Sequence, residues 1–553
     1  MTYRRNLYKC TVALFLMGLT LASCSDWDDH YSATPQSGES LWTTLSQNSE
    51  LSHFTKVLQA CGYDAALKSS QVFTVFAPNN SHFSAEQADS VIALYQAEKA
   101  RGVKNDDNMA IKEFVQNHIA LYNYSTATAG SDSVTMINGK YQVLTPKTFG
   151  GEQMASVNQQ CSNGVLFTLA HTVPYIPNVY EHLSKDADLD SVGHFYKSYS
   201  KYIFDPSQSV PGGIVNGRTQ YLDSVFHLKN ELFSEVGPIN REDSTYWVLA
   251  PTNRQWQQLT NEYEKYFNYA NNVKKRDSLQ FIHSRLSIIR GTVFSRTRNT
   301  DATINDSVLS TNAYPYKLRR YVWGRPDLAY YQFQQPFANG GVFASTSKKN
   351  CSNGMVLKPT TWNVNKLNTF WQEIIVEGEA SHSLKKLSSL KTKDPLTVVT
   401  VQSRNPFYNK VSNNSYVEII PKTSSVNDSA AFNVHNVLSN IGYDIYVVTV
   451  PALAGDTLAT AEQRLPYKFN CTLGYIDQNG EEKTMTLKNG AVTKADVIDS
   501  VLVGKNVRIP TCSYGLDIPQ VSITLESYVR NRETSKYSRT IRLDCIVLKP
   551  HRE

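Results

Sequence analysis

The chain has 553 residues, of which 19% are charged and 41% are hydrophobic, and its formal net charge is +6. At roughly 100–200 residues per domain, this length predicts about three or four domains rather than one large core. The composition excludes an intrinsically disordered chain and a polytopic membrane protein, and glycine and proline show no period that would indicate collagen.

Residues 1–23 have the pattern of a secretory signal peptide. Three basic residues and no acidic one lie in residues 1–9, and the apolar run 10–22 is too short to span a bilayer comfortably. The run leads into Leu21-Ala22-Ser23-Cys24, which resembles a bacterial lipobox. This resemblance implies that Cys24 carries lipid chains that attach the protein to a membrane. An ordinary signal peptide followed by a chance cysteine is the alternative.

A polar tether at residues 24–38 is predicted to follow. Its acidic patch at 25–29 resembles the export tag that some Gram-negative bacteria place after the lipid-bearing cysteine. That resemblance implies an outer-membrane protein exposed at the cell surface, and a solvated linker is the alternative. Removing residues 1–23 takes three basic residues from the chain and lowers the net charge from +6 to +3. Because the charge is small and no basic run exists, nucleic acid is excluded as a partner.

Three short blocks recur in the same order along the next part of the chain, at offsets of 138, 173 and 190 residues. The paired blocks are 45–51 with 183–189, 74–80 with 247–253, and Cys161-Ser162-Asn163-Gly164 with the identical Cys351-Ser352-Asn353-Gly354. Three blocks in register predict a duplicated domain, at 39–180 and 181–370, whose second copy is longer. The blocks are typical of a helix start, a short strand ending at proline, and a tight turn before a strand.

The first copy resembles the fasciclin family. The resemblance rests on Thr-Val-Phe-Ala-Pro-Asn-Asn-x-x-Phe at 74–83, on Ser-Asn-Gly-Val-Leu at 162–166, and on His118, which lies like the family's central histidine. It implies an α+β fold, a wedge-shaped β-sandwich with a helical cap, and a role in adhesion and extracellular binding rather than catalysis. His118 is therefore a candidate binding residue, although a structural, hydrogen-bonded histidine is favoured. The second copy departs from this pattern, because Arg285 aligns with His118.

Residues 371–553 are predicted to form a separate all-β sandwich. Apolar residues alternate over 467–475 and 541–547, which is typical of strands with one buried face. Seven or more such strands with turns between them favour an antiparallel sandwich. The segments 375–379 and 541–550 resemble the first and last strands of galactose-binding-like jelly rolls. That resemblance implies a carbohydrate- or protein-binding module but identifies no pocket.

The candidate binding surface lies in the second copy, where aromatic residues and arginines alternate between positions 312 and 337. They are Tyr314, Tyr316, Arg319, Arg320, Tyr321, Trp323, Arg325, Tyr330, Tyr331, Phe333 and Phe337. Aromatic rings with a polar tip, combined with arginine, are frequent in protein interfaces and sugar-stacking platforms. The alternative is that half of these rings are strand core. A helix-spaced stripe of Tyr263, Tyr266 and Tyr269 is predicted to pack rather than bind.

The sequence contains no motif for catalysis, a metal or a cofactor. It lacks His-Glu-x-x-His, Cys-x-x-Cys, Gly-x-Ser-x-Gly and a phosphate-binding glycine loop. Residues 186–190 are only faintly similar to a calcium loop, and a charged helix start is the favoured interpretation. We therefore predict that the protein uses no cofactor and no metal. The six cysteines after Cys24 are expected to be mostly free and buried.

Together these features predict a non-catalytic, lipid-anchored binding protein at the cell surface. Its ligand would be an extracellular glycan, or the protein would be an accessory of an outer-membrane nutrient importer of the SusC/SusD type, a context implied by the kind of lipoprotein it resembles. The alternative is an adhesin that contacts host or neighbouring-cell proteins through its fasciclin-like domains. A third hypothesis is a glycan-degrading enzyme, whose acid and base carboxylates the sequence cannot pair.

Overall fold

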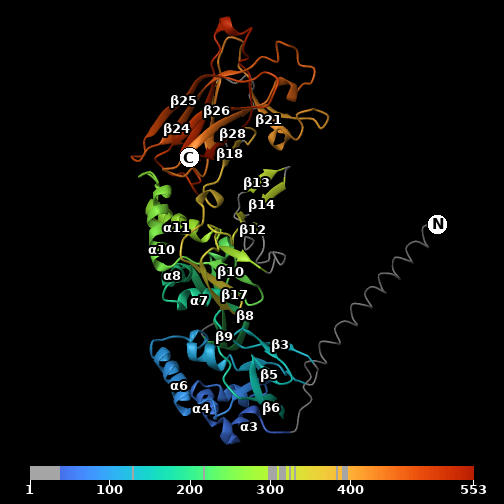
Figure 1. The fold of residues 1–553 in the computed structure, drawn as a ribbon, viewed down its shortest axis with the longest axis vertical. Helices are drawn as coiled ribbons and strands as arrows, with labels where there is room; N and C mark the ends of the chain where they lie inside the picture. Colours follow the sequence, from blue (N-terminus) through green and yellow to red (C-terminus); the bar gives the residue numbers. More distant parts are fainter. Residues whose placement is uncertain are drawn as a thin grey trace, which may run out of the picture. The chain divides into compact units, whose positions relative to one another are not determined.

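The computed structural model describes residues 38–126, 130–215, 218–296, 308–310, 319–322, 325–328, 332–380, 384–388 and 397–552. The chain divides into two compact units, Met1–Ile176 and Pro177–Glu553 (Figure 1). The predicted signal peptide, Cys24 and nearly all of the tether lie outside the described residues. The first unit and the start of the second mix helices with strands, and the rest of the second is built from strands. The predicted fold class, α+β followed by an all-β sandwich, is confirmed.

Helices form one layer of the first unit. They are α3 (Leu41–Gln47), η1 (Ser49–Leu51), α4 (Ser52–Ala60), α5 (Asp64–Lys68), α6 (Ala85–Ala100), η2 (Asn105–Asp107) and the π-helical turn η3 (Ala110–Val115). In α4, Phe54, Val57 and Leu58 recur at helical spacing, and all three are fully buried. Helix α6 begins at a capping box, in which Ser84 and Gln87 each bond the other's main-chain N–H.

A seven-stranded sheet forms the other layer, in the order β2-β1-β7-β6-β5-β4-β3. Its strands are β1 (Phe73–Pro78), β2 (Ile119–Leu121), β3 (Asp132–Thr135), β4 (Tyr141–Leu144), β5 (Thr148–Phe149), β6 (Glu152–Cys161) and β7 (Gly164–Leu169). Strand β1 runs parallel to β7 and is buried along its whole length. Because successive side chains point to opposite faces, Val75 packs with the helices, whereas Phe76 stacks on Phe149 and Phe167 in a second core.

The second unit begins with a related arrangement. Its helices are α7 (Val179–Lys185), α8 (Asp190–Ser198), α9 (Phe233–Val236), α10 (Asn253–Tyr263), η4 (Glu264–Phe267) and α11 (Arg276–Ile289). A four-stranded sheet in the order β11-β10-β17-β16 contains β10 (Tyr246–Leu249), β11 (Val293–Ser295), β16 (Thr346–Cys351) and β17 (Gly354–Pro359). Strand β10 is parallel to β17 and antiparallel to β11, as β1 is to β7 and β2. The order and directions of these central strands are therefore the same in both units.

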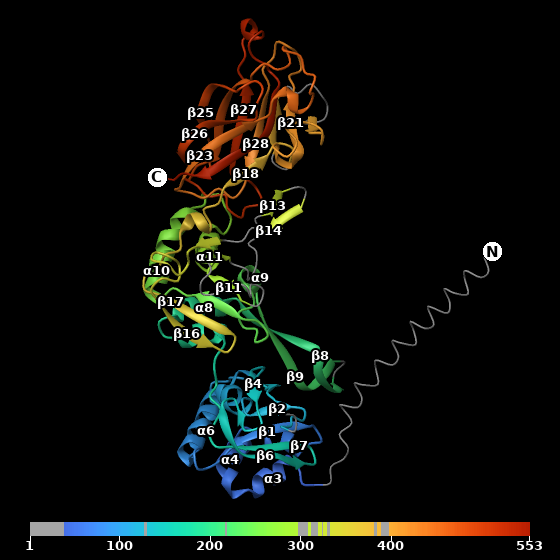
Figure 2. The ribbon, with the colours of Figure 1, turned by 45° about the vertical axis from the view of Figure 1, so that its right-hand side comes forward.

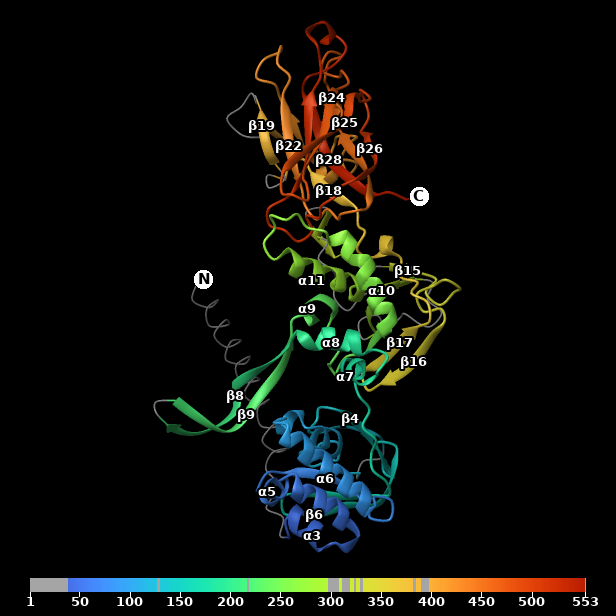
Figure 3. The ribbon, with the colours of Figure 1, turned by 90° about the vertical axis from the view of Figure 1, so that its left-hand side faces the viewer.

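The extra length of the second copy forms β-hairpins. The longest joins β8 (Ser200–Val215) to β9 (Arg218–Asn230), and Figure 3 shows it as a long two-stranded ribbon. Two shorter pairs lie in the aromatic segment: β12 (Val308–Ser310) with β15 (Gln332–Gln334), and β13 (Arg319–Val322) with β14 (Arg325–Leu328).

The Ser-Asn-Gly turn of the first copy is held by its asparagine side chain. Asn163 accepts a hydrogen bond from the main-chain N–H of Leu41 (2.8 Å) and donates to the carbonyls of Leu67 (2.9 Å) and Ser69 (2.7 Å). Gly164 follows with φ 148°, and a Cβ there would lie 1.9 Å from the carbonyl oxygen of β1. Only asparagine followed by glycine satisfies both requirements at this turn.

The second copy repeats these contacts. Asn353 accepts from the N–H of Val179 (2.8 Å) and donates to the carbonyls of Ile239 and Arg241, both at 2.9 Å. Gly354 has φ 136°, and a Cβ there would lie 1.8 Å from the carbonyl oxygen of β10. Identical sequence in the two turns therefore reflects identical geometry.

A second pair of asparagines anchors the helices in the same way. Asn80 accepts a hydrogen bond from the N–H of His53 (3.1 Å), and Asn253 accepts one from the N–H of Ser191 (2.8 Å). The asparagines are separated by the 173-residue offset of their block and their partners by the 138-residue offset of the helical block. The spacing between the repeated blocks thus corresponds to equivalent contacts in space.

The strand register corrects one predicted pairing. The N–H of Phe76 donates to the carbonyl of His118, and the N–H of Leu249 donates to the carbonyl of Thr292, each at 2.9 Å. Thr292, which directly precedes β11, therefore occupies the place of His118, which directly precedes β2. The alignment of Arg285 with His118 was wrong, because Arg285 lies inside α11. Different lengths of chain before the strand shift the helix relative to the sheet.

The C-terminal part of the second unit is a sandwich of two sheets (Figure 2). One sheet has the order β20-β21-β28-β23-β26, with β18 also paired to β28, and the other has the order β19-β22-β27-β24-β25. The strands are β18 (Ile374–Glu377), β19 (Leu384–Ser388), β20 (Thr397–Thr400), β21 (Ser415–Ile419), β22 (Ser429–Val434), β23 (Gly442–Thr449), β24 (Lys468–Ile476), β25 (Glu482–Val492), β26 (Asp499–Arg508), β27 (Val521–Ser527) and β28 (Ile541–Pro550). The predicted alternation in β24 is confirmed, because Phe469, Cys471 and Leu473 are buried.

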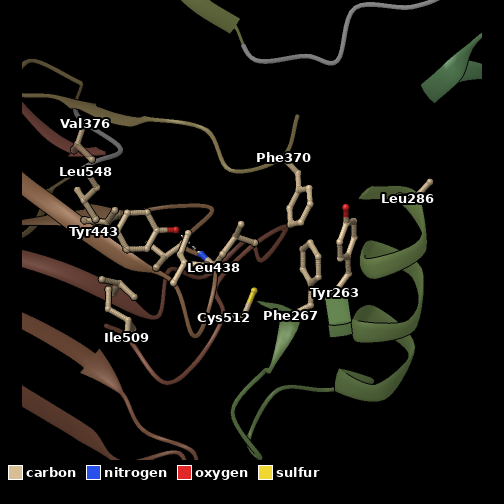
Figure 4. Close-up of a cluster of buried hydrophobic side chains, with 14 of the residues drawn as sticks. Tyr263, Phe267, Leu286, Phe370, Val376, Leu438, Tyr443, Ile509, Cys512 and Leu548 are labelled. Carbon is tan, nitrogen blue, oxygen red and sulfur yellow. Dashed lines mark hydrogen bonds between the residues drawn. The ribbon is translucent and has the colours of Figure 1, made fainter. Parts of the chain in front are cut away.

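The sandwich packs directly against the end of α10 and η4. In Figure 4, Tyr263, Phe267 and Phe370 lie together on one side, and Tyr443 and Cys512 of the sandwich lie beside them. All belong to one continuous buried cluster that also contains the sandwich interior. The rings of Tyr263 and Phe370 are 4.8 Å apart between centroids. The predicted packing role of the tyrosine stripe is thus confirmed, and its partner is the sandwich.

Hydrogen bonds between main chains strengthen this joint. The N–H of Ser439 donates to the carbonyl of Tyr266 (2.9 Å), and the N–H of Cys512 donates to the carbonyl of Asn268 (2.8 Å). The Tyr269 hydroxyl donates to the carbonyl of Tyr514 (2.8 Å). Main-chain bonds fix position and orientation together, so the second unit behaves as one packed body across the predicted boundary at residues 370 and 371.

Two further features of the described chain bear on its class. The six cysteines from Cys61 to Cys545 are unpaired, and five of them are buried. Within the described residues, none of the helices combines the length and the apolar character that a membrane span needs.

Candidate functional site

The predicted aromatic surface is only partly placed by the structure. Tyr314, Tyr316, Trp323, Tyr330 and Tyr331 lie outside the described residues. Arg319, Arg320 and Tyr321 lie on β13, opposite residues 326–328 of β14. Phe333 and Phe337, at the end of the segment, pack with Phe294 and Phe343 in a small core. These last two rings therefore follow the core interpretation, and the binding interpretation of the others stays a prediction.

His118 has a structural environment. Its ring is fully buried, Nδ1 lies 2.8 Å from the carbonyl oxygen of Phe114, and Nε2 accepts a hydrogen bond from the N–H of Val173 (3.0 Å). Because Nε2 is an acceptor, Nδ1 carries the proton and donates, and the imidazole is neutral. Burial lowers the pKa of His118 to about 4. Both nitrogens are occupied by the main chain, so the geometry agrees with the favoured structural role.

The sandwich contains a cluster of carboxylates that the sequence did not single out as a site. The acidic cluster consists of Glu377 at the end of β18, Glu379 two residues later, Asp544 on β28, and Asn413 from the loop before β21. Glu377 and Glu379 share one face because strand side chains alternate. Gly378 between them donates its N–H to the carbonyl of Asp544 (2.8 Å), which holds the two strands together.

Hydrogen bonds hold one side of each carboxylate. The Ser412 hydroxyl donates to Glu377 Oε1 (2.8 Å), and the Ser412 N–H reaches both oxygens of Asp544 (3.1 and 3.3 Å). Asn413 Nδ2 donates to Glu379 Oε1 at 3.2 Å. Among the described residues, Glu377 Oε2, Glu379 Oε2 and Asn413 Oδ1 are buried without a hydrogen-bond partner. Buried acceptors without donors cost free energy, so they indicate an additional positive group.

The electrostatics of the acidic cluster point the same way. Burial and the neighbouring acids raise the pKa of Glu377 to about 7, and burial raises the pKa of Asp544 to about 8. Ligand atoms of Glu377, Asp544 and Cys545 lie within 4.8 Å of one another. Burial also raises the pKa of the Cys545 thiol, which therefore stays protonated and is a poor ligand. The remaining donors are oxygens, the ligand type that Ca²⁺ prefers.

The acidic cluster fits a cation better than a catalytic pair of acids. Asp544 is only 3% exposed, and both its oxygens accept the same main-chain N–H. A general acid must reach its substrate, whereas a structural cation needs enclosed oxygens. The sequence signal was the Glu-x-Glu spacing at 377 and 379. Asp544 could not be added, because it lies 165 residues further along the chain.

Comparison with known proteins identifies the first unit. The Fasciclin domain family model matches residues 49–173. The comparison with curated proteins gives no match. Among solved structures, the chain is similar to a FAS1 domain pair from the insect cell adhesion molecule fasciclin I, with 12% identity over 57% of this chain and 98% of that one and a TM-score of 0.19.

Two carbohydrate-binding modules are also among the similar structures. The xylan-binding CBM22-1 domain of Paenibacillus barcinonensis Xyn10C has 10% identity over 33% of this chain and 95% of that one, with a TM-score of 0.21. TmCBM61, solved with β-1,4-galactotriose, has 15% identity over 31% of this chain and 91% of that one, with a TM-score of 0.16. The family match covers β1, the region of His118 and β7, which are the elements that carry the repeated contacts. The chain therefore carries a fasciclin domain at residues 49–173.

Proposed function

We propose that the protein is a non-catalytic lipoprotein of the outer membrane that holds an extracellular glycan at the cell surface. The observation that carries the proposal is the combination of a fasciclin domain with a β-sandwich, both of which are kinds of domain that bind rather than catalyse. We further propose that residues 181–370 are a second, divergent fasciclin domain. The repeated contacts of Asn163 and Asn353 support this.

Glycan binding is tested with the mature, full-length protein on an array of microbial and host polysaccharides. Retention of at least one polysaccharide at micromolar affinity supports the proposal. Binding only to proteins of neighbouring cells would replace it with the adhesin alternative. Recovery of an outer-membrane transporter with the protein from detergent-solubilised membranes would identify the importer accessory role. Replacing Trp323 and Tyr331 by alanine should weaken ligand binding by about 2 kcal/mol if these rings are anchors.

We also propose that the acidic cluster binds one Ca²⁺ ion, which fixes the loop at residues 412–415 against β18 and β28. The three buried oxygens without donors support this assignment. At a Ca²⁺ concentration 100 times the Kd, binding should stabilise the sandwich by about 2.7 kcal/mol.

Thermal unfolding in EDTA and in 1 mM Ca²⁺ measures that stabilisation. Glu379→Gln should remove most of it, because the variant loses one charged ligand. The control Glu526→Gln changes an exposed residue on β27 outside the cluster and should respond to Ca²⁺ like the wild type. Equal unfolding temperatures of the wild type in EDTA and in Ca²⁺ would disprove the cation site.

A further inference from the structure

A pocket of about 570 Å³ lies at the end of the sandwich where β28 begins. Three loops form it: the segment after β21, the segment before β24, and the segment between β27 and β28. Hydroxyl groups dominate its wall, from residues 423–425 and from Thr534, Ser538 and Thr540. Tyr537, Glu462 and Arg539 complete its polar lining. We call it the loop pocket. It is separate from the acidic cluster, with which it shares no residue.

Arg539 carries an uncompensated charge at this pocket. Its side chain is 93% buried and donates to the carbonyls of Ser424 and Val529 and to the side-chain oxygens of Asn427 and Asn531. All these acceptors are neutral, and no carboxylate of the described chain pairs with the guanidinium. A buried cation without an opposite charge is costly, so a bound anion would be favoured here. Of the five N–H donors, one at Nη1 is left for a ligand.

Glu462 lies on the same pocket but does not neutralise Arg539. It is exposed, and within the described residues it forms no ion pair with the arginine. Tyr537 is half-buried, and Lys468 Nζ lies 5.3 Å from the centroid of its ring. The pocket thus combines a buried cation, an aromatic ring and many hydroxyls. That set of groups matches a ligand that is itself rich in hydroxyls and carries one carboxylate.

We propose that the loop pocket binds an acidic saccharide, with the carboxylate of a hexuronic acid unit at Arg539 and the sugar hydroxyls at the serine and threonine side chains. This inference rests on the proposed glycan-binding function and names its ligand class and its place. The planar guanidinium suits a carboxylate better than a lysine ammonium does. Glu462 repels the carboxylate and so limits the affinity.

The test uses the full-length mature protein and NMR titration with three pairs of methyl glycosides: glucuronide with glucoside, galacturonide with galactoside, and mannuronide with mannoside. In each pair the ring stereochemistry is the same and only the carboxylate differs. At least one acid should bind about tenfold more tightly than its neutral counterpart. Glu462→Gln should strengthen that binding about threefold, since it removes a like charge. Arg539→Lys should weaken it tenfold or more. Glu50→Gln, an exposed change in the first unit, is the matched control.

The outcomes separate this inference from the proposed function. Equal binding of acidic and neutral members, or an acid preference that neither variant at the pocket changes, would overturn the inference while leaving glycan binding in place. Failure of every glycoside and every polysaccharide to bind would overturn both. If Arg539→Lys does not fold, the Glu462→Gln measurement alone decides, because that side chain is exposed and replaceable.

Discussion

Replacing Asn163 or Asn353 by alanine should destabilise each unit by a similar amount. Each side chain makes three hydrogen bonds of 2.7–2.9 Å to the main chain. At about 1 kcal/mol each, their loss costs about 3 kcal/mol, and the main-chain N–H of Leu41 or Val179 is left buried without an acceptor. We therefore expect the free energy of unfolding to fall by about 3–5 kcal/mol in the unit that carries the change.

Hydrogen exchange read by mass spectrometry measures the two units independently. Asn163→Ala should reduce protection of the peptides that contain β1 and β7, and Asn353→Ala should reduce protection of those that contain β10 and β17. Ser162→Ala is the control, because this neighbouring side chain is exposed and should change stability by less than about 0.5 kcal/mol. A loss below about 1 kcal/mol for both asparagines would refute the idea that these turns hold the fold together.

Three other outcomes are expected. His118 should stay neutral down to about pH 4 by NMR, and its share of stability, about 3 kcal/mol, should be lost as the pH falls from 6.5 to 4, since only the unfolded state then binds the proton; a titration midpoint near 6.5 would contradict the burial argument. Asn268→Ala removes hydrogen bonds to Gln478 (2.8 Å) and Pro510 (3.2 Å), and hydrogen exchange should show α10 and the sandwich weakened together by about 1–3 kcal/mol; weakening of one alone would count against a single packed body. Cys24→Ala should release the protein from the membrane fraction, and mass spectrometry of an unmodified wild-type N-terminus would exclude lipidation.

The duplicated fold could be predicted because its contacts depend on particular side chains. Asn163 and Gly164 are each needed for the geometry of one turn, so the same letters recur at Asn353 and Gly354. The alternation in β24 was visible because one face of that strand is buried. In such places a local pattern carries a three-dimensional requirement, and the prediction followed from the residues themselves.

The candidate sites could be predicted only in part. The spacing of Glu377 and Glu379 placed two carboxylates on one face, but Asn413 reaches them through a left-handed turn, with φ 50°, that no pattern announces. The loop pocket joins three segments that are distant in sequence, so its chemistry appears only when the sandwich is assembled. The joint between α10 and the sandwich was missed for the same reason, because a stripe of tyrosines does not name its partner.

The joint between α10 and the sandwich has a consequence for biosynthesis. Asn268 bonds Pro510, which lies 242 residues later in the chain. At about 5–20 residues per second, a ribosome needs about 10–50 seconds to make the intervening residues. During that interval Tyr263 and Phe267 have no sandwich to cover them and form an adhesive aromatic surface. Holding chaperones, or delay of folding until export is complete, would protect the nascent chain from aggregation over this period.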